Sequence, residues 1–134
     1  KVADLASSTG TWPEAVHPRT GGGCMGDGHH GWAAAEWILM IANMFVREEN
    51  GFLILGSGVF PEWFDSGQEF SFGPTPTEHG DISLVFEPVD GDWYLRVKGQ
   101  QPILADKCKV RVPGFKPEIV SREKQELRIK LHRS

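Results

Sequence analysis

The apolar run from Trp37 to Val46 constrains this chain most, because Asn43 is its only polar residue. It belongs to a helix predicted from about His29 to Arg47, rich in helix-forming residues and stopped by Asn50-Gly51. A surface helix carries one apolar stripe, whereas this run is apolar nearly all round, and it is too short to cross a bilayer. We therefore expect a fully buried helix, covered on one side by residues that are not in this sequence.

The second part of the sequence alternates apolar and polar residues, as strands that bury one face do. Gly and Pro separate the segments, and Asp90-Gly91 is typical of a hairpin turn. The pattern predicts about six strands, at Phe52–Leu55, Glu69–Phe72, Ile82–Glu87, Trp93–Lys98, Lys107–Val112 and Gln125–His132. Such spacing predicts a mainly β fold, an antiparallel, Greek-key-like β-sandwich preceded by the helix. We expect the loop and helix to occupy residues 1–50 and the sandwich residues 51–134.

Charge and cysteine content exclude several classes of function. Lysine and arginine number 14 against 18 aspartate and glutamate residues, and the net charge of −4 comes without a basic run. Nucleic acids and anionic membranes require clustered basic residues, so we expect neither as a partner. The two cysteines, Cys24 and Cys108, are too few for a disulfide scaffold. Cys108 alternates with lysines, which predicts a small buried residue on a strand.

A glycine cluster from Gly21 to Gly28 precedes the helix. It lacks the Lys-Ser/Thr pair of a phosphate-binding loop, and no strand leads into it. The adjacent His29 and His30 do not indicate a metal site either, because neighbouring helical side chains point about 100° apart. We therefore expect no cofactor and no metal. The glycines instead allow the backbone to approach a ligand closely.

Residues able to carry chemistry are concentrated between Thr11 and Trp37. This stretch holds three carboxylates, three histidines, one arginine and three tryptophans. Tryptophan rings stack on the C–H faces of sugars, while carboxylates bond sugar hydroxyls, so the composition favours carbohydrate binding. The candidate substrate-binding residues are Trp12, Arg19, Asp27, His29, His30 and Trp32, and the candidate catalytic residue is Glu14.

The motifs of this stretch are Trp12-Pro13-Glu14, His17-Pro18-Arg19-Thr20-Gly21 and Gly26-Asp27-Gly28, followed by Gly31-Trp32-Ala33 where the helix opens. In this order they resemble the last loop and helix of an (α/α)6-barrel glycoside hydrolase of the glucoamylase-like type. The later Pro61-Glu62-Trp63-Phe64 is similar to the small C-terminal β-sandwich that caps such barrels. Ala15, His17 and Gly31-Trp32 depart from the family, which usually has Gln, Asp and an aromatic-Ser pair there.

The resemblance implies that Glu14 is the general base that activates the attacking water. An inverting glycosidase pairs two carboxyl groups about 6.5–9.5 Å apart, and the general acid would lie in an upstream barrel domain of the same chain. The sequence opens without Met, at Lys1, as a piece of a longer protein would. We expect this piece to be inactive by itself.

The candidate residues also have structural interpretations. Glu14 is equally typical of an exposed loop, and Asp27 of a helix cap. Arg19 is suited to pairing with either carboxylate as well as with a ligand. Glu36 lies within the apolar helix, and we expect it to form a structural salt bridge.

The leading hypothesis is the C-terminal part of a glycoside hydrolase, with a carbohydrate substrate. One alternative is a non-catalytic carbohydrate-binding or interaction module, although such a module has no use for a helix apolar all round. Another is a phosphorylase or lyase on the same barrel. Because the uncovered side of Trp37–Val46 exceeds what monomers normally expose, we expect the isolated chain to self-associate.

Overall fold

The computed structural model describes residues 2–26, 28–100, 103–122 and 126–134, with the backbone alone for residues 103–107 and 121–122. The chain divides into two compact units, Lys1–Ile41 and Ala42–Ser134. The first unit contains a 3₁₀ turn (Ala3–Leu5), strands β1 (Ala15–Val16) and β2 (Gly23–Cys24), and most of helix α1 (Gly31–Phe45). The last turn of α1 belongs to the second unit.

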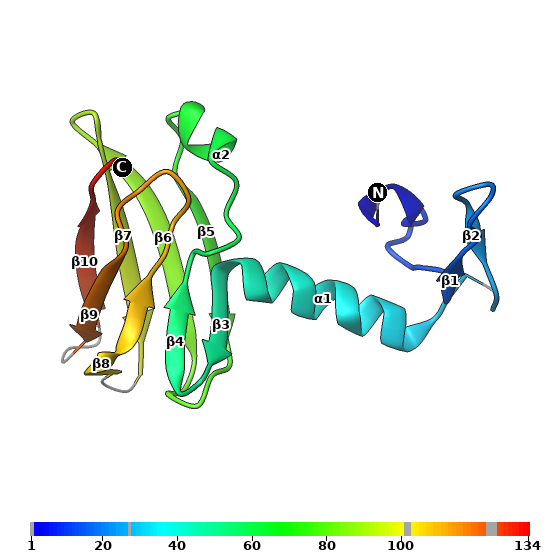
Figure 1. The fold of residues 1–134 in the computed structure, drawn as a ribbon, viewed down its shortest axis with the longest axis horizontal. Helices are drawn as coiled ribbons and strands as arrows, with labels where there is room; N and C mark the ends of the chain where they lie inside the picture. Colours follow the sequence, from blue (N-terminus) through cyan, green and yellow to red (C-terminus); the bar gives the residue numbers. More distant parts are fainter. Residues whose placement is uncertain (1, 27, 101–102, 123–125) are drawn as a thin grey trace. The chain divides into compact units, whose positions relative to one another are not determined.

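The second unit is a mainly β sandwich, which confirms the predicted fold class. One sheet has the order β10-β7-β6-β5 and the other β3-β4-β8-β9, and Figure 1 shows them as two layers. The first comprises β5 (Phe70–Thr75), β6 (Ile82–Val89), β7 (Asp92–Gly99) and β10 (Glu126–Leu131). The second comprises β3 (Val46–Glu49), β4 (Phe52–Leu55), β8 (Ile103–Val110) and β9 (Glu118–Arg122). All six predicted strands are present, and β3 and β9 are additional.

Strand β3 replaces the predicted end of the helix. Helix α1 stops at Phe45, and the chain continues directly into Val46–Glu49 as a strand paired with β4. Asn50 and Gly51 form the hairpin turn between these strands, with φ angles of 52° and 75°. Both angles are left-handed, as a two-residue type I′ turn requires, and Asn-Gly adopts them readily. The interpretation of this dipeptide as a helix stop is therefore wrong.

The hairpin predicted at Asp90-Gly91 is confirmed, and it joins β6 to β7 with φ angles of 52° and 85°. The prediction that the strands are antiparallel fails at one pair, because β4 and β8 run parallel, with Leu53 beside Cys108 and Leu55 beside Val110. Between these two strands the chain builds β5, β6 and β7 of the opposite sheet. This excursion allows β8 to return in the same direction as β4.

The core lies between the two sheets and follows the predicted alternation. Its least exposed side chains are Leu53, Leu55, Ile82, Leu84, Phe86, Leu95, Val97, Cys108 and Val110. The short helix α2 (Glu62–Asp65) adds Phe64, which is 3% exposed. The Phe64 ring meets the rings of Phe70, Phe86, Trp93 and Phe115 edge-on at centroid distances of 4.8–5.8 Å. Edge-to-face packing of this kind is the favoured geometry for buried aromatic rings.

Helix α1 is joined to the sandwich through its last turn. The backbone N–H groups of Gly56 and Gly58 donate to the carbonyls of Phe45 and Met44 at 2.7 and 2.9 Å. A Cβ at Gly58 would lie 2.8 Å from the Met44 Cα, so only glycine permits this approach. Phe45 itself is buried and stacks on Phe72 at 4.6 Å. The end of the helix is therefore part of the core of the second unit.

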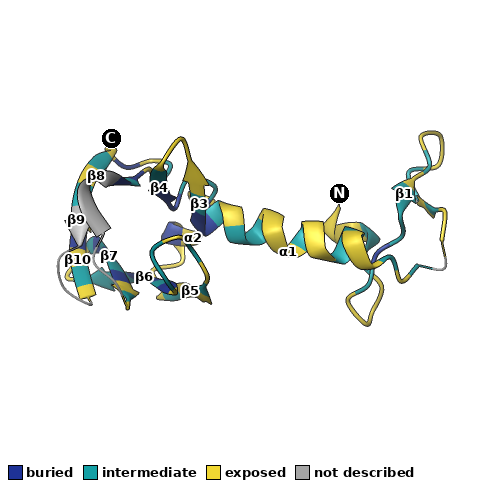
Figure 2. Cartoon of the chain, turned by 90° about the horizontal axis from the view of Figure 1, so that it is seen from below, coloured by how far each residue is buried: buried dark blue, intermediate teal, exposed yellow. Residues whose placement is uncertain are grey.

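The earlier turns of α1 are exposed within this chain. Figure 2 shows exposed and intermediate residues along the helix, and Ile38, Leu39 and Met40 are 65%, 53% and 43% exposed. The described residues leave much of these side chains open to solvent, so full burial of the helix stays a prediction about residues outside this sequence. Among the described residues, no helix is long and apolar enough to span a membrane.

Candidate functional site

The first unit brings the loop around Glu14 against the start of helix α1. The backbone N–H of His30 donates to the Trp12 carbonyl at 2.9 Å, and the His30 carbonyl then accepts from Ala34 in the first helical turn. Strand β1 follows Glu14, and its hairpin with β2 pairs Ala15 with Cys24. These bonds hold the carboxylate-bearing loop and the histidine-bearing helix start side by side.

Glu14, His30 and Trp32 form the cluster that we take as the candidate site. A carboxylate oxygen of Glu14 lies 3.8 Å from His30 Nε2, with 36% of the Glu14 side chain and 22% of the His30 side chain exposed. The His30 ring contacts Trp32 edge-on at 4.9 Å, and Trp32 is 60% exposed. The cluster thus combines a solvent-accessible carboxylate, an imidazole and an open aromatic ring.

His30 has one further property that bears on the site. Its Nδ1 is buried and has no hydrogen-bond partner within the described part of the chain. Nε2 faces Glu14, so the two ring nitrogens lie in different environments. A buried polar atom without a protein partner is uncommon in folded proteins, so this nitrogen is available to a bound water or to a ligand hydroxyl.

Trp12, one of the candidate substrate-binding residues, is largely enclosed within the first unit. It is 9% exposed, stacks on Trp37 at a centroid distance of 5.1 Å, and donates its Nε1–H to the Val2 carbonyl at 3.0 Å. A ring enclosed in this way presents little surface to a ligand. Trp12 is therefore a packing residue of the first unit in this structure, and Trp32 presents the open ring.

The remaining candidates are exposed or lie outside the described residues. Arg19 is exposed in the β1–β2 turn, whereas His30 is the basic side chain that lies beside Glu14. Asp27, predicted as a binding residue or a cap, lies outside the described residues. His29 is exposed. Glu36 is exposed too, so the structural salt bridge that we expect for it stays a prediction, as does the burial of the helix.

Local structure explains several glycines without any ligand. Gly21 adopts a φ of 69° in the β1–β2 turn, where its N–H donates to the His17 carbonyl at 2.8 Å. A Cβ at Gly23 would lie 2.5 Å from Pro13 Cγ, so glycine lets β2 approach the Glu14 loop closely. These two glycines therefore build the β1–β2 hairpin that packs against the Glu14 loop. That the glycine cluster lets the backbone approach a sugar stays a prediction.

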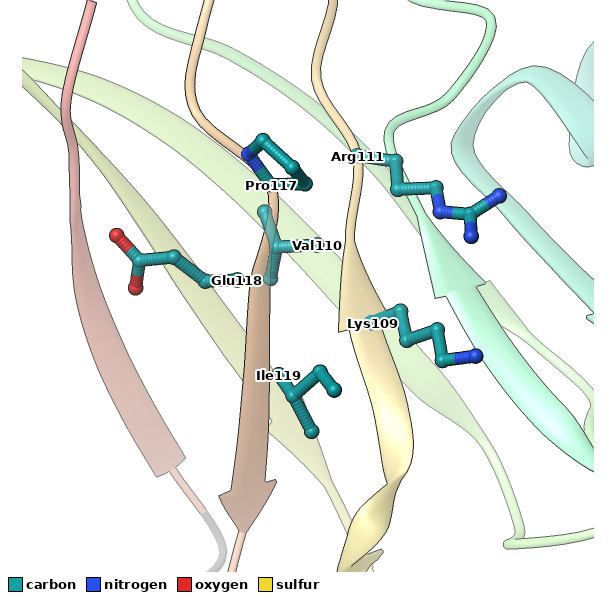
Figure 3. Close-up of a pocket in the computed structure, with 6 residues that line it drawn as sticks. All are labelled: Lys109, Val110, Arg111, Pro117, Glu118 and Ile119. Carbon is teal, nitrogen blue, oxygen red and sulfur yellow. The ribbon is translucent and has the colours of Figure 1, made fainter.

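The second unit contains separate clefts. Figure 3 shows one of about 320 Å³, lined by Lys109, Val110, Arg111, Pro117, Glu118 and Ile119 of β8, β9 and their connection. The Lys109 ammonium already lies 3.2 Å from the centre of the Phe52 ring, a cation–π contact that occupies this cation. Within the described residues no group of histidine, cysteine and carboxylate side chains is arranged to hold a metal ion.

Comparison of the chain with models of protein families, with curated proteins and with solved structures found no match.

Proposed function

We propose that this chain is the C-terminal part of a glycoside hydrolase, in which the first unit contributes one edge of the active site and Glu14 is the general base. The observation that supports this most is the position of Glu14, whose carboxylate is accessible, adjoins His30 and lies in a cluster with the open ring of Trp32. A base that activates water must be reachable by solvent, and a sugar needs an aromatic surface beside it.

The role of each residue follows from its chemistry. The Glu14 carboxylate accepts a proton from the water that attacks the anomeric carbon, and the general acid comes from a barrel domain upstream. Nε2 of His30 lies 3.8 Å from the carboxylate, close enough to orient it once substrate and the rest of the site are in place. Trp32 stacks against a sugar ring. Arg19 and His29 are exposed, and in this proposal they bond sugar hydroxyls in the active site that the upstream barrel completes.

The exposed helix is a second, independent support for a larger catalytic body. Ile38, Leu39 and Met40 present contiguous apolar surface that a folded protein normally buries. The neighbouring helices of an (α/α)6 barrel would cover it. The second unit closes its own core and, in this proposal, stabilises the barrel as a C-terminal cap.

The decisive experiment changes Glu14→Gln in the longer enzyme and measures hydrolysis of a panel of neutral oligosaccharides. Loss of the base should lower kcat by about 10²–10⁴-fold, with KM changed little. The matched control is Glu126→Gln, because Glu126 is an exposed carboxylate of the second unit and does not belong to the helix that the barrel would cover. A kcat for Glu14→Gln within twofold of the unchanged enzyme would refute the assignment.

The same assay separates the alternative reactions. Release of a sugar phosphate only when inorganic phosphate is added would indicate a phosphorylase, and an unsaturated product would indicate a lyase. Catalysis by the 134-residue chain alone would contradict the proposal that the general acid lies upstream.

A further inference from the structure

A cleft of about 470 Å³ lies in the second unit between helix α2 and the start of strand β5. It is lined by Phe45, Glu62, Trp63, Ser66, Gln68, Glu69, Phe70 and Ser71. The volume falls within the range of about 300–1,000 Å³ that is usual for small-molecule sites. β5 is an edge strand of its sheet. The backbone N–H and C=O groups on its outer side therefore have no neighbouring strand of the described chain to pair with.

The aromatic rings of the cleft leave one ring available to a ligand. Phe45 stacks on Phe72 at 4.6 Å and on Trp63 at 5.9 Å, and with 6% of its surface exposed it offers little area to a ligand. Phe70 is stacked on Phe86 at 4.7 Å and meets Trp63 edge-on at 5.6 Å. Trp63 stacks on Phe45 and meets Phe60 edge-on at 5.4 Å, and 38% of it remains exposed as the surface that a ligand could contact. The cleft therefore offers one exposed aromatic surface, that of Trp63, with packed rings behind it. Its lining does not form an aromatic cage of the kind that encloses a cation.

The rim of the cleft is polar and carries negative charge. Glu62, Gln68 and Glu69 are exposed, and none of the eight lining residues is basic. Ser66 fixes this aromatic surface, since its hydroxyl donates to the Trp63 carbonyl at 2.8 Å and accepts from the Gln68 N–H at 3.2 Å. Two carboxylates and an amide accept hydrogen bonds from hydroxyl groups and repel anions.

We propose that this cleft is a saccharide-binding site for neutral sugars, with one pyranose ring stacked on Trp63 and its hydroxyls bonded by Glu62, Gln68 and Glu69. One open ring beside hydroxyl-bonding side chains is the arrangement that a pyranose requires, with an apolar face and a polar periphery. Acidic sugars are excluded by the two carboxylates. The site lies entirely within residues 42–134 and does not depend on Glu14 or on the proposed hydrolase activity.

The test follows the tryptophan indole N–H signals of the ¹⁵N-labelled 134-residue chain by NMR during titration, together with the backbone N–H signals of the cleft residues, which still report on binding when Trp63 is replaced. The probes are maltohexaose and cellohexaose as neutral sugars, an oligogalacturonate as the acidic analogue, and choline as an organic cation. We expect a neutral probe to shift the Trp63 signal saturably, with a Kd of about 1 mM, and the acidic probe to bind at least tenfold more weakly.

Two variants locate the binding. Trp63→Ala should weaken binding of the neutral probe at least tenfold, and Gln68→Ala, which leaves the aromatic packing untouched, should weaken it severalfold. Trp32→Ala is the control, because Trp32 is the open ring of the candidate hydrolase site in the other unit. Binding that disappears with Trp32→Ala but persists in Trp63→Ala would overturn this inference and leave the proposed function standing.

Other outcomes also decide the question. No shift of the Trp63 signal by either neutral probe, equal binding of the acidic probe, or a shift by choline in place of sugar would each overturn the saccharide site. A shift of Trp63 by a neutral probe, combined with full kcat in the Glu14→Gln variant, would support the site while refuting the proposed hydrolase role.

Discussion

The two units of this chain bury apolar surface in different ways. In the second unit, two sheets turn their alternating apolar faces toward each other, and Leu84, Phe86 and Leu95 are fully buried. In the first unit, the Trp12–Trp37 stack is a small core, while Ile38 and Leu39 remain more than half exposed. A sandwich supplies its own cover because each sheet presents an apolar face to the other, whereas a single helix needs another element to cover it.

The largest test of this difference is Phe86→Ala. Phe86 is 0% exposed and contacts the rings of Phe45, Phe64 and Phe70, so its removal leaves a cavity in the sandwich core. We expect the free energy of unfolding to fall by about 3–5 kcal/mol, measured by urea denaturation with far-UV circular dichroism. Trp32→Ala, at the surface of the first unit, should change it by less than about 0.5 kcal/mol. Equal losses in the two variants would remove the distinction between the units.

A smaller effect is expected from the ion pairs on the outer face of the sandwich. Arg96 and Arg128 lie directly opposite each other on β7 and β10, and Glu87 contacts them at 3.4 and 2.7 Å. Because the Glu87 side chain is only 16% exposed, Glu87→Gln should cost about 1–2 kcal/mol and leave two facing cations without their counter-charge.

The control for this prediction is Glu126→Gln in the same urea experiment. Glu126 pairs with Lys98 at 3.6 Å and its side chain is 50% exposed. Exposed ion pairs contribute little, so we expect a loss below about 0.5 kcal/mol. A Glu87→Gln variant no less stable than Glu126→Gln would show that the three-residue cluster does not hold these strands together.

The smallest effect on stability should come from the exposed helix. Ile38→Gln combined with Leu39→Gln removes apolar surface from solvent-exposed positions of α1, so the free energy of unfolding should change by less than about 0.5 kcal/mol. Self-association, however, should decrease clearly in size-exclusion chromatography and sedimentation. If the unchanged chain is already a clean monomer, the helix needs no cover and one support for the upstream barrel is lost.

Local patterns predicted most of the sandwich because alternation along one strand is set by the residues of that strand. Ile82, Leu84 and Phe86 face the core as expected, and Asp90-Gly91 forms its hairpin. β3 was missed because Val46–Glu49 continues a helical pattern and its partner comes after the turn. Short strands carry too few residues for periodicity to separate them from helix ends.

The sequence indicated which residues belong to the candidate site better than it indicated how they are arranged. Glu14, His30 and Trp32 do lie together, whereas Trp12 is held inside by Trp37, a partner that is distant in sequence. The cleft at Trp63 was not predicted, although Pro61-Glu62-Trp63-Phe64 stood out as a motif. Seven of its eight lining residues lie within residues 62–71, and Phe45 of α1 is the one that comes from a distant part of the chain. The local sequence therefore held most of the lining, and only the fold added the aromatic ring behind it.

The sequence by itself determined the mainly β character of the second unit, the hairpin at Asp90-Gly91 and the apolar character of the helix, since these depend on neighbouring residues. Tertiary structure decided that β4 and β8 run parallel, that Phe64 enters the core and that Trp63 stays open while Trp12 does not. The physical reason is that pairing and packing join residues far apart in the chain, and burial of any one ring depends on which of them arrive beside it.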